Sequence, residues 1–484
     1  MKILFYYRGA ENFGIEYISA VLKEAGHETG LIFDPGFDDT FYFRTPALKL
    51  LKVKEKLIEQ AKSFSPDLMA FSSITNLYPY VKEMAYALKK ELNVLAVIGG
   101  VHSSALPEYV LKEPCFDMLC LGEGEYPMLD LTQRMSQGRD FSDIDNLWVK
   151  RKDRIIRNKE RPLIEDLDRL PFPDKELFYK KGAFYKDMLI MTSRGCPYHC
   201  SFCVNSFYLD KYGSKTIRRR GVDKIIEEIR MYKERYNPRF IHFDDDVFTA
   251  SDGWFEEFSR RYRAEIGIEF LVNIHPAMVN RRTAILLKEA GCRVACMGVQ
   301  TGNERSRLDL LRRNDSNSRI MEAARVLKDA DIHLTTEFIF GLPDETEEQS
   351  WESVLFNSAI LPASTSTFIF YPFPGTELAE FSVKSGLLDE ESLEMIKEGR
   401  GSYHTSLFLK NDHNHFFLNT AMLLPLFSKF PVLIRNGYFR KFCRKKTNFL
   451  HRLLGICAIP FFNPFLFREK LINYLRMFWV YLRQ

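Results

Sequence analysis

Short apolar runs alternate with helix-like stretches twice along this 484-residue chain, and this alternation restricts its fold more than any other feature. The first series lies within residues 1–140, with apolar runs at 3–7, 29–33, 68–72, 94–99 and 118–121. Alternating strands and helices are typical of a parallel sheet, because parallel neighbours need a crossover connection. We therefore predict an α/β protein whose residues 1–140 form a doubly wound, Rossmann-like domain.

The second series spans residues 187–400 and predicts a second α/β domain. Its apolar runs lie at 188–192, 240–243, 269–272, 294–299, 334–340 and 367–371. About six βα units fit a partial or complete TIM-like barrel. Charged residues and prolines at 141–186 predict a linker between the two domains. Aromatic and basic segments at 401–484 predict a small C-terminal helical region.

Small residues follow three strands of the predicted first domain. They are Ser72, Ser73, Gly99, Gly100 and Gly122. Ligands of doubly wound sheets bind at the carboxyl ends of the strands. We therefore expect a ligand site at these residues.

The cysteines point to metal or redox chemistry. Residues 1–8 hold too short an apolar run for a signal peptide, so we expect a cytoplasmic protein. Nine cysteines then have no oxidising compartment in which to pair. The net charge of +4 is small for this length and does not indicate a nucleic acid partner.

The C-terminal tail differs in character from the rest. From Pro425 onward, roughly twelve Lys and Arg residues stand against one acid, Glu469. The apolar run 453–467 is shorter than the ~20 residues of a spanning helix and contains two prolines. Two interpretations stay open: a helical cap that completes the barrel core, or a segment that makes peripheral contact with a membrane.

One group of three cysteines is tightly spaced. Residues 193–203 read SRGCPYHCSFC and follow the run 188–192 directly, which places Cys196, Cys200 and Cys203 in a loop after a barrel strand. Three thiolates can hold an iron-sulfur cluster and leave one iron open to another ligand. A zinc site would need a fourth ligand, for which only His199 is close in sequence.

This C-x3-C-x2-C motif, with Phe202 before its last cysteine, resembles the signature of the radical S-adenosylmethionine (SAM) superfamily. The resemblance implies a [4Fe-4S] cluster on Cys196, Cys200 and Cys203 and SAM on the open iron. It also implies reductive cleavage of SAM, hydrogen abstraction from carbon, and an external one-electron reductant of the flavodoxin or ferredoxin type.

Later segments resemble the same superfamily in the same order. They read IHFDDDVF at 241–248, MGVQTG at 297–302, FGLPDET at 340–346 and YPFPGT at 371–376. The resemblance implies that Asp245 and Gln300 line the SAM site together with Phe202. Gln300 stands where the family usually has a glutamate. A solvated acidic turn and a solvent-facing amide are the alternatives for Asp245 and Gln300.

The N-terminal domain resembles the cobalamin (B12)-binding domain that precedes the radical SAM domain in one subgroup. The resemblance is carried by residues 14–28, 98–102, 117–125 and 167–174. It implies that Ser72, Ser73, Gly99, Gly100 and Gly122 lie close to the cobalamin. The loop 8–13 has no D-x-H-x-x-G motif, so the lower cobalt face should lack a protein imidazole. We interpret His102 as a polar residue at a strand end. A domain retained only as a scaffold is the alternative.

The resemblance thus predicts a cobalamin-dependent radical SAM enzyme that methylates an unactivated carbon of a small-molecule or lipid-like substrate. Members of the subgroup also perform cyclisations and rearrangements without methyl transfer, and this alternative stays open. A cobalamin-dependent sensor is a third interpretation from a different class.

Overall fold

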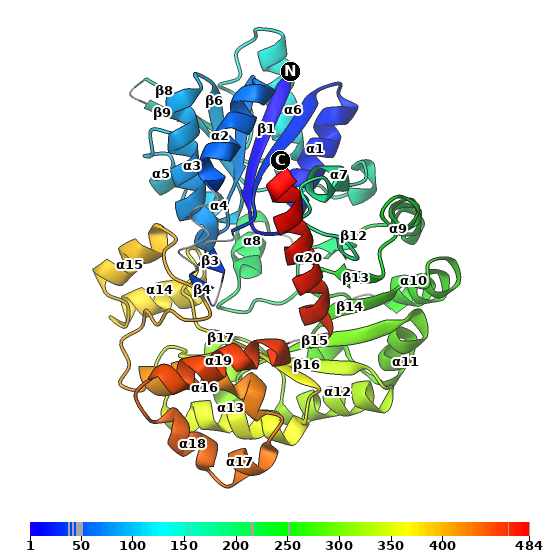
Figure 1. Cartoon of the computed structure of the whole chain (residues 1–484), viewed down its shortest axis with the longest axis vertical. Coiled ribbons are helices and arrows are strands. Elements are labelled where there is room, and N and C mark those ends of the chain that lie inside the picture. The colour runs from blue at the N-terminus through cyan, green and yellow to red at the C-terminus, as the bar shows by residue number, and fades with distance from the viewer. Residues whose placement is uncertain are drawn as a thin grey trace. The chain divides into compact units, whose positions relative to one another are not determined.

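A computed structural model describes residues 1–36, 39–40, 43–44, 52–152, 154–213, 217–249, 252–462 and 464–483. Contacts divide the chain into two compact units (Figure 1). The first comprises Met1–Tyr185, Glu394–Arg400 and Asn473–Gln484, and the second comprises Lys186–Leu393 and Gly401–Ile472.

The first unit is built on a seven-stranded sheet of order β2-β1-β5-β6-β7-β8-β9. Its parallel strands are β1 (Lys2–Arg8), β2 (Glu28–Asp34), β5 (Leu68–Ser72), β6 (Leu95–Gly99) and β7 (Met118–Cys120). The connecting helices are α1 (Phe13–Glu24), α2 (Val53–Phe64), α3 (Tyr78–Glu91), α4 (Val101–Ala105) and α5 (Pro107–Val110), and α6 (Glu125–Ser136) follows β7. A short pair, β3 (Asp39–Thr40) and β4 (Phe43–Arg44), lies apart from this sheet. The predicted doubly wound domain is confirmed.

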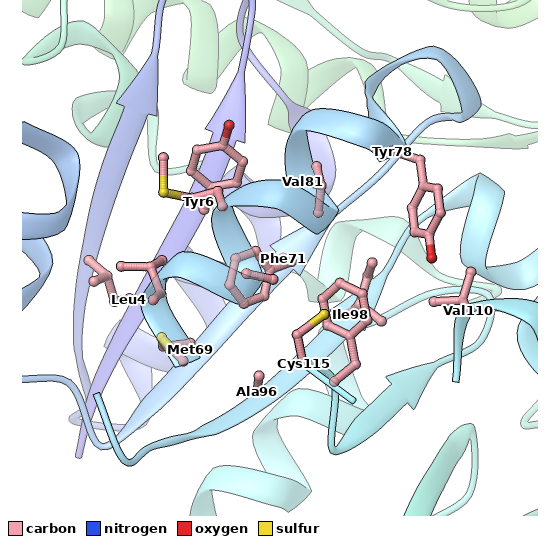
Figure 2. Packing of buried hydrophobic residues seen from close by; sticks show 14 of the residues in the cluster. Leu4, Tyr6, Met69, Phe71, Tyr78, Val81, Ala96, Ile98, Val110 and Cys115 are labelled. Carbon is pink, nitrogen blue, oxygen red and sulfur yellow. The ribbon is translucent and has the colours of Figure 1, made fainter. Parts of the chain in front are cut away.

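One face of this sheet forms a continuous apolar core (Figure 2). Alternate strand residues contribute to it, as strand geometry requires. They include Leu4 and Tyr6 of β1, Met69 and Phe71 of β5, and Ala96 and Ile98 of β6. Helices α2 and α3 cover this face, for example through Leu57, Ala61, Val81 and Leu88. One face of each helix and alternate residues of each strand therefore pack together in one buried layer.

Residues 141–186 are more ordered than the predicted linker. Strands β8 (Leu147–Arg151) and β9 (Arg154–Arg157) extend the first sheet in antiparallel pairing. Their short sequences, LWVKR and RIIR, contain four charged residues among nine and so show no clear apolar run, as suits an antiparallel edge with one side in water. The prolines predicted to interrupt regular structure come later, at Pro171 and Pro173, just before α7 (Lys175–Tyr179).

Lys175 at the start of α7 is buried and ties this segment to α1. Its ammonium lies 2.8 Å from a carboxylate oxygen of Glu11 and 2.8 Å from one of Glu16. The neighbouring Asp174 accepts a 2.6 Å hydrogen bond from Ser19 Oγ. All three charged side chains of the Lys175 group are nearly inaccessible, so each depends on the others for compensation.

The second unit contains six parallel strands in the order β10-β13-β14-β15-β16-β17. They are β10 (Asp187–Ile190), β13 (Phe240–Phe243), β14 (Glu269–Ile274), β15 (Cys292–Gln300), β16 (His333–Phe340) and β17 (Ser364–Ile369). The crossover helices are α9 (Val222–Tyr236), α10 (Asp252–Glu265), α11 (Arg281–Ala290), α12 (Asn317–Asp329) and α13 (Glu347–Ile360). Among the described strands, β10 and β17 are the two edges, so the structure is a partial barrel.

Helices follow the barrel to the end of the chain. They are α14 (Glu377–Lys384), α15 (Glu390–Lys397), α16 (Asn414–Phe427), α17 (Pro431–Arg435), α18 (Tyr438–Cys443), α19 (Phe449–Phe462) and α20 (Pro464–Arg483). Helix α16 packs on β16 and β17, and Thr367 of β17 hydrogen-bonds to the carbonyl of Ala421. This packing favours the cap interpretation. No helix within the described ranges is long and apolar enough to cross a membrane.

The end of α20 belongs to the first unit, which the predicted single region 401–484 did not anticipate. Arg476 donates a 2.9 Å hydrogen bond to the carbonyl of Phe184 and lies over the rings of Tyr179 and Tyr185. Nothing in the local sequence of α20 indicates this partner, because the contact joins residues almost 300 positions apart.

Replacing Lys175 by Met should destabilise the protein by about 3–5 kcal/mol, because two buried carboxylates would lose the buried cation that they share. Urea denaturation measures this change. The matched control is Lys180→Met, which breaks an exposed pair with Glu176 and should change stability by less than about 1 kcal/mol. Adding Glu11→Gln and Glu16→Gln to Lys175→Met should restore part of the loss. Equal stability of both lysine variants would contradict this interpretation.

Glu345 should make the protein less stable at alkaline pH. Its carboxylate accepts hydrogen bonds from the amides of Gly341 (2.6 Å) and Leu342 (3.0 Å), and burial raises its pKa to about 8. Between the unfolded value of 4.5 and about 8, the folded state holds the proton more tightly, so stability falls as pH rises. The slope approaches about 1.4 kcal/mol per pH unit. Glu345→Gln should remove this slope in denaturation at pH 6 and pH 9, whereas exposed Glu391→Gln should keep it.

Candidate functional site

The three closely spaced cysteines lie on one loop at the carboxyl end of β10. This loop runs from β11 (Ser193–Arg194) to α8 (Val204–Tyr212), and β11 pairs with β12 (Arg218–Arg219). Cys200 is buried, and Cys196 and Cys203 are partly exposed. Burial raises the pKa of the Cys196 and Cys203 thiols to about 12, and the neighbouring thiol of Cys200 adds to this effect. The structure therefore brings the three predicted metal ligands together.

Asp245 fixes the beginning of this loop. The residue follows β13, and its buried carboxylate accepts hydrogen bonds from the Thr192 amide (3.1 Å), the Thr192 hydroxyl (2.7 Å) and the Ser193 hydroxyl. Burial raises the pKa of Asp245, while Arg219 and the hydroxyl donors oppose the shift. Strands β10 and β13 are paired neighbours, so a carboxylate after one reaches the loop after the other.

The middle of the loop is fixed by backbone contacts at Ser201. Its amide donates to the Leu311 carbonyl (3.2 Å), and its hydroxyl donates to the Leu310 carbonyl (2.6 Å). Its own carbonyl accepts from the Leu378 amide at 2.8 Å. The cysteine loop is thus held by segments that follow β13, β15 and β17.

A polar group that the sequence analysis did not identify lies against the loop. Tyr198, between the first two cysteines, stacks on His275 with ring centroids 3.7 Å apart. His275 Nδ1 accepts from the Ala277 amide, which leaves the hydrogen on Nε2, 3.3 Å from a carboxylate oxygen of Asp315. Burial and the nearby Arg313 lower the pKa of His275 to about 2, so the ring is neutral.

Arg313 links this group to the second cysteine. Its guanidinium donates to the Gly298 carbonyl at 2.9 Å and lies 3.5 Å from Asp315. Burial raises the pKa of the Cys200 thiol, and the charge and hydrogen bond of Arg313 oppose that shift. In the sequence, Arg313 and Asp315 sit in the charged stretch RLDLLRRND, which resembles any solvated helix end. Only the tertiary structure shows that both are buried.

Gln300 ends β15 in a left-handed backbone conformation, with φ of 68°. Its side chain folds back over Gly298, where a β-carbon would lie 2.4 Å from the Gln300 amide nitrogen. The same position faces Arg313 at 3.6 Å. Gln300 and Arg313 both lie over Gly298, which puts the amide close to the guanidinium. Phe202, directly before Cys203, is partly buried in the cysteine loop.

The three thiols of the loop fit an iron-sulfur cluster by their chemistry. Within the described ranges, no three His, Cys, Asp or Glu side chains converge closely enough to hold one metal ion. In an iron-sulfur cluster the thiolates bind different irons, so they need not converge on one point. A partly buried loop with three thiols and a neighbouring guanidinium fits the anionic cluster that the sequence predicts.

The predicted small residues of the first unit gather at one edge of its sheet. Ser72 and Gly99 are register partners in β5 and β6, and the Ser73 amide donates to the Gly99 carbonyl at 3.0 Å. A β-carbon on Gly100 would lie 2.6 Å from the Ser73 carbonyl, so this glycine permits the two loops to pack together. Ser73 is fully buried, whereas the other four residues remain partly exposed along this edge.

The edge lies beside the point where the strand order reverses, between β1 and β5, which is the ligand position in doubly wound sheets. Its partly exposed, small residues fit a large ligand that approaches the backbone closely. Arg8 at the end of β1 is held by Asp34 at 2.6 Å and lies over the Tyr80 ring. His102 is fully buried, and its ring lies tilted against that of Tyr78 with the centroids 4.3 Å apart. Burial lowers the pKa of His102 to about 3.

Two family models match the chain. Residues 8–132 match the B12 binding domain, and residues 190–356 match the Radical SAM superfamily. The two matched regions fall on the two sheets described above and cover the cysteine loop, Asp245 and Gln300.

Curated proteins and solved structures resemble the same combination. An uncharacterised methyltransferase from Pyrococcus horikoshii is 28% identical over 382 residues, covering 78% of this chain and 79% of that protein. An anaerobic magnesium-protoporphyrin IX monomethyl ester cyclase from Rubrivivax gelatinosus is 25% identical, covering 88% and 79%. The radical SAM methyltransferase TsrM from Kitasatospora setae, solved with cobalamin and a [4Fe-4S] cluster, shares the fold at TM-score 0.64 and 16% identity, covering 79% and 75%.

The matches join a B12-binding domain to a radical SAM domain in the order that the two sheets occupy along the chain. This protein therefore belongs to the cobalamin-dependent radical SAM enzymes, whose cofactors are a [4Fe-4S] cluster, S-adenosylmethionine and cobalamin.

Proposed function

We propose that this enzyme transfers a methyl group to an unactivated carbon of a small-molecule or lipid-like substrate. The observation that carries the proposal is the clamped C-x3-C-x2-C loop in a chain that also has a B12-binding domain. The methyltransferase from Pyrococcus horikoshii, similar over 78% of the chain, supports methyl transfer as the outcome.

Cys196, Cys200 and Cys203 would hold the cluster, and the strand-end residues of the first unit would contact cobalamin. When bound, these cofactors supply hydrogen abstraction from carbon and methyl transfer. Arg313 would stabilise the Cys200 thiolate through its charge and hydrogen bond. Two residues would contact SAM in this proposal. Phe202 lies within the cysteine loop, and Gln300 lies close to Arg313, which contacts Cys200.

Asp245 acts in this proposal by positioning the loop. Sequence resemblance predicts that it lines the SAM site, yet its carboxylate already accepts three hydrogen bonds from Thr192 and Ser193. A carboxylate with this many donors is committed to holding the chain that enters the cysteine motif. An external one-electron reductant completes the proposal, since the cluster must be reduced before each cycle of SAM cleavage.

A second candidate is cyclisation or rearrangement without methyl transfer. The cyclase from Rubrivivax gelatinosus is similar over 88% of this chain, which is a longer match than that of the methyltransferase. The two candidates require the same cysteine loop and differ in the fate of the substrate.

Methyl transfer predicts two products from SAM. The protein is purified without oxygen and reconstituted with iron, sulfide and cobalamin. After chemical reduction in the presence of SAM, it should form both 5′-deoxyadenosine and S-adenosylhomocysteine. Cys200→Ala should abolish both by mass spectrometry, because the cluster loses a ligand. The control is Cys457→Ala, which removes an exposed thiol outside the motif and should leave both products unchanged. Formation of 5′-deoxyadenosine alone, with substrate present, would support the cyclase candidate instead.

The positioning role of Asp245 predicts a loss of bound cluster. In Asp245→Asn, one carboxylate oxygen is replaced by an NH2 group, which cannot accept a hydrogen bond from the Thr192 amide or hydroxyl. The start of the cysteine loop should therefore be held less firmly. We expect a several-fold lower iron and sulfide content per chain after reconstitution, and a weaker cluster signal by electron paramagnetic resonance. Asp244→Asn, on the exposed neighbour, is the control. A full cluster content combined with weakened SAM binding would instead support the direct SAM contact.

A further inference from the structure

The C-terminal helices contain a long stretch without acidic residues. From His413 to Arg468 the sequence has no Asp or Glu. It contains nine basic residues, Lys429, Arg435, Arg440, Lys441, Arg444, Lys445, Lys446, Arg452 and Arg468. The stretch includes α16 to α19, which lie in the second unit. Its surface is therefore positively charged wherever these residues reach the solvent.

Helices α17 and α18 have both an anchored and an exposed side. Ile434, Phe439 and Cys443 are completely buried, and the Phe439 ring stacks on Phe427 of α16 at 4.7 Å. In contrast, Val432 is 64% exposed and Tyr438 is 63% exposed. Figure 1 shows α17 and α18 side by side, beyond α13 and α16 as seen from the sheet. The two helices are fixed in place while apolar side chains remain in water.

Helix α19 continues this surface. Phe449, Leu453 and Ile456 are exposed and recur at helical spacing, which puts them on one face, and Phe449 is 80% exposed. The opposite face is buried, and its His451 stacks on Phe442 of α18 at 4.3 Å. The start of α19 is therefore adjacent to α18.

Basic residues surround these apolar side chains. Arg440 and Arg444 pair with Glu347, and Arg440 also pairs with Glu348. Five others are exposed: Arg435, Lys441, Lys445, Lys446 and Arg452. Exposed apolar groups beside exposed cations are typical of a segment that lies at a membrane interface.

We propose that the exposed surface of α17, α18 and the start of α19 docks onto a bilayer that contains anionic phospholipids. The lysines and arginines would meet the headgroups while Val432, Tyr438 and Phe449 enter the boundary with the acyl chains. Nucleic acid would explain the charge, but it would leave the exposed aliphatic side chains in water. The proposal does not depend on which reaction the enzyme performs.

The proposed surface is confined to α17, α18 and the start of α19. Arg476 near the end of α20 is held by Tyr179, Phe184 and Tyr185 within the first unit, so this cation is not part of the surface. The buried side of α16 to α19 completes the barrel unit, and the outer side remains for the lipid. The two interpretations of the tail thus describe opposite faces of the same helices.

Vesicle co-sedimentation of the full-length protein tests the proposal without turnover or loaded cofactors. Wild type should bind vesicles of phosphatidylcholine mixed with phosphatidylglycerol, bind pure phosphatidylcholine much more weakly, and lose binding as salt rises. Lys441→Gln/Lys445→Gln/Lys446→Gln should lower partitioning to the anionic vesicles by about 100-fold, since each of the three surface charges contributes roughly five-fold. Val432→Ser/Tyr438→Ser/Phe449→Ser should lower it at every salt concentration.

Matched controls remove exposed residues elsewhere. Lys90→Gln/Lys112→Gln/Lys224→Gln removes three exposed lysines, and Ile285→Ser/Leu308→Ser removes exposed apolar side chains. Both should bind like wild type, and circular dichroism should show that all variants are folded. The proposal is overturned if wild type does not bind, or if the surface variants bind as well as the controls. It is also overturned if the apolar variant binds vesicles like wild type and only changes the oligomeric state. The same holds if the charge variant binds vesicles like wild type and loses only nucleic acid binding. Each of these results leaves the proposed reaction standing.

Discussion

The cysteine loop can present three thiolates in a fixed arrangement only because it is anchored to its own sheet at several points. A loop of this length has no regular hydrogen bonds of its own, so neighbouring segments must satisfy its backbone. Asp245 binds the residues that enter the loop, and Leu310, Leu311 and Leu378 bind Ser201 in its middle. These partners follow different strands, and the parallel order of the strands brings their carboxyl ends to one edge. The site therefore depends on the complete sheet.

Burial gives this site a second constraint. Cys200, Asp245 and the His275–Asp315 pair are buried, and an isolated charge there would be costly. Neighbouring donors and cations offset this cost: Arg219 acts on Asp245, and Arg313 contacts both Asp315 and the second cysteine of the motif. The same principle governs the first unit, where Lys175 compensates two buried glutamates that come from the loop after β1 and from α1. In both units, segments far apart in sequence are joined by buried charge.

Much of the architecture could be predicted because apolar periodicity reports burial directly. The strands 3–7, 68–72, 240–243 and 294–299 coincide with β1, β5, β13 and most of β15. Strands β8 and β9 could not be found in this way, since an antiparallel edge with a solvated side carries charged residues. The end of α20 was also missed, because its amphipathic sequence shows that it packs but does not name the partner.

The amino-acid sequence by itself determined the candidate ligands of this protein. Three cysteines at fixed spacing after a strand predict the cluster loop, and the order of the two α/β patterns predicts the pair of domains. Only the tertiary structure decided how that loop is held. It bonds Asp245 to Thr192 and Ser193 at the start of the loop, buries Arg313 beside Cys200, and turns apolar side chains of α17 to α19 outward. The reason is physical: ligand identity and strand period are local properties of a sequence, whereas hydrogen-bond partners and exposure depend on segments that meet only after folding.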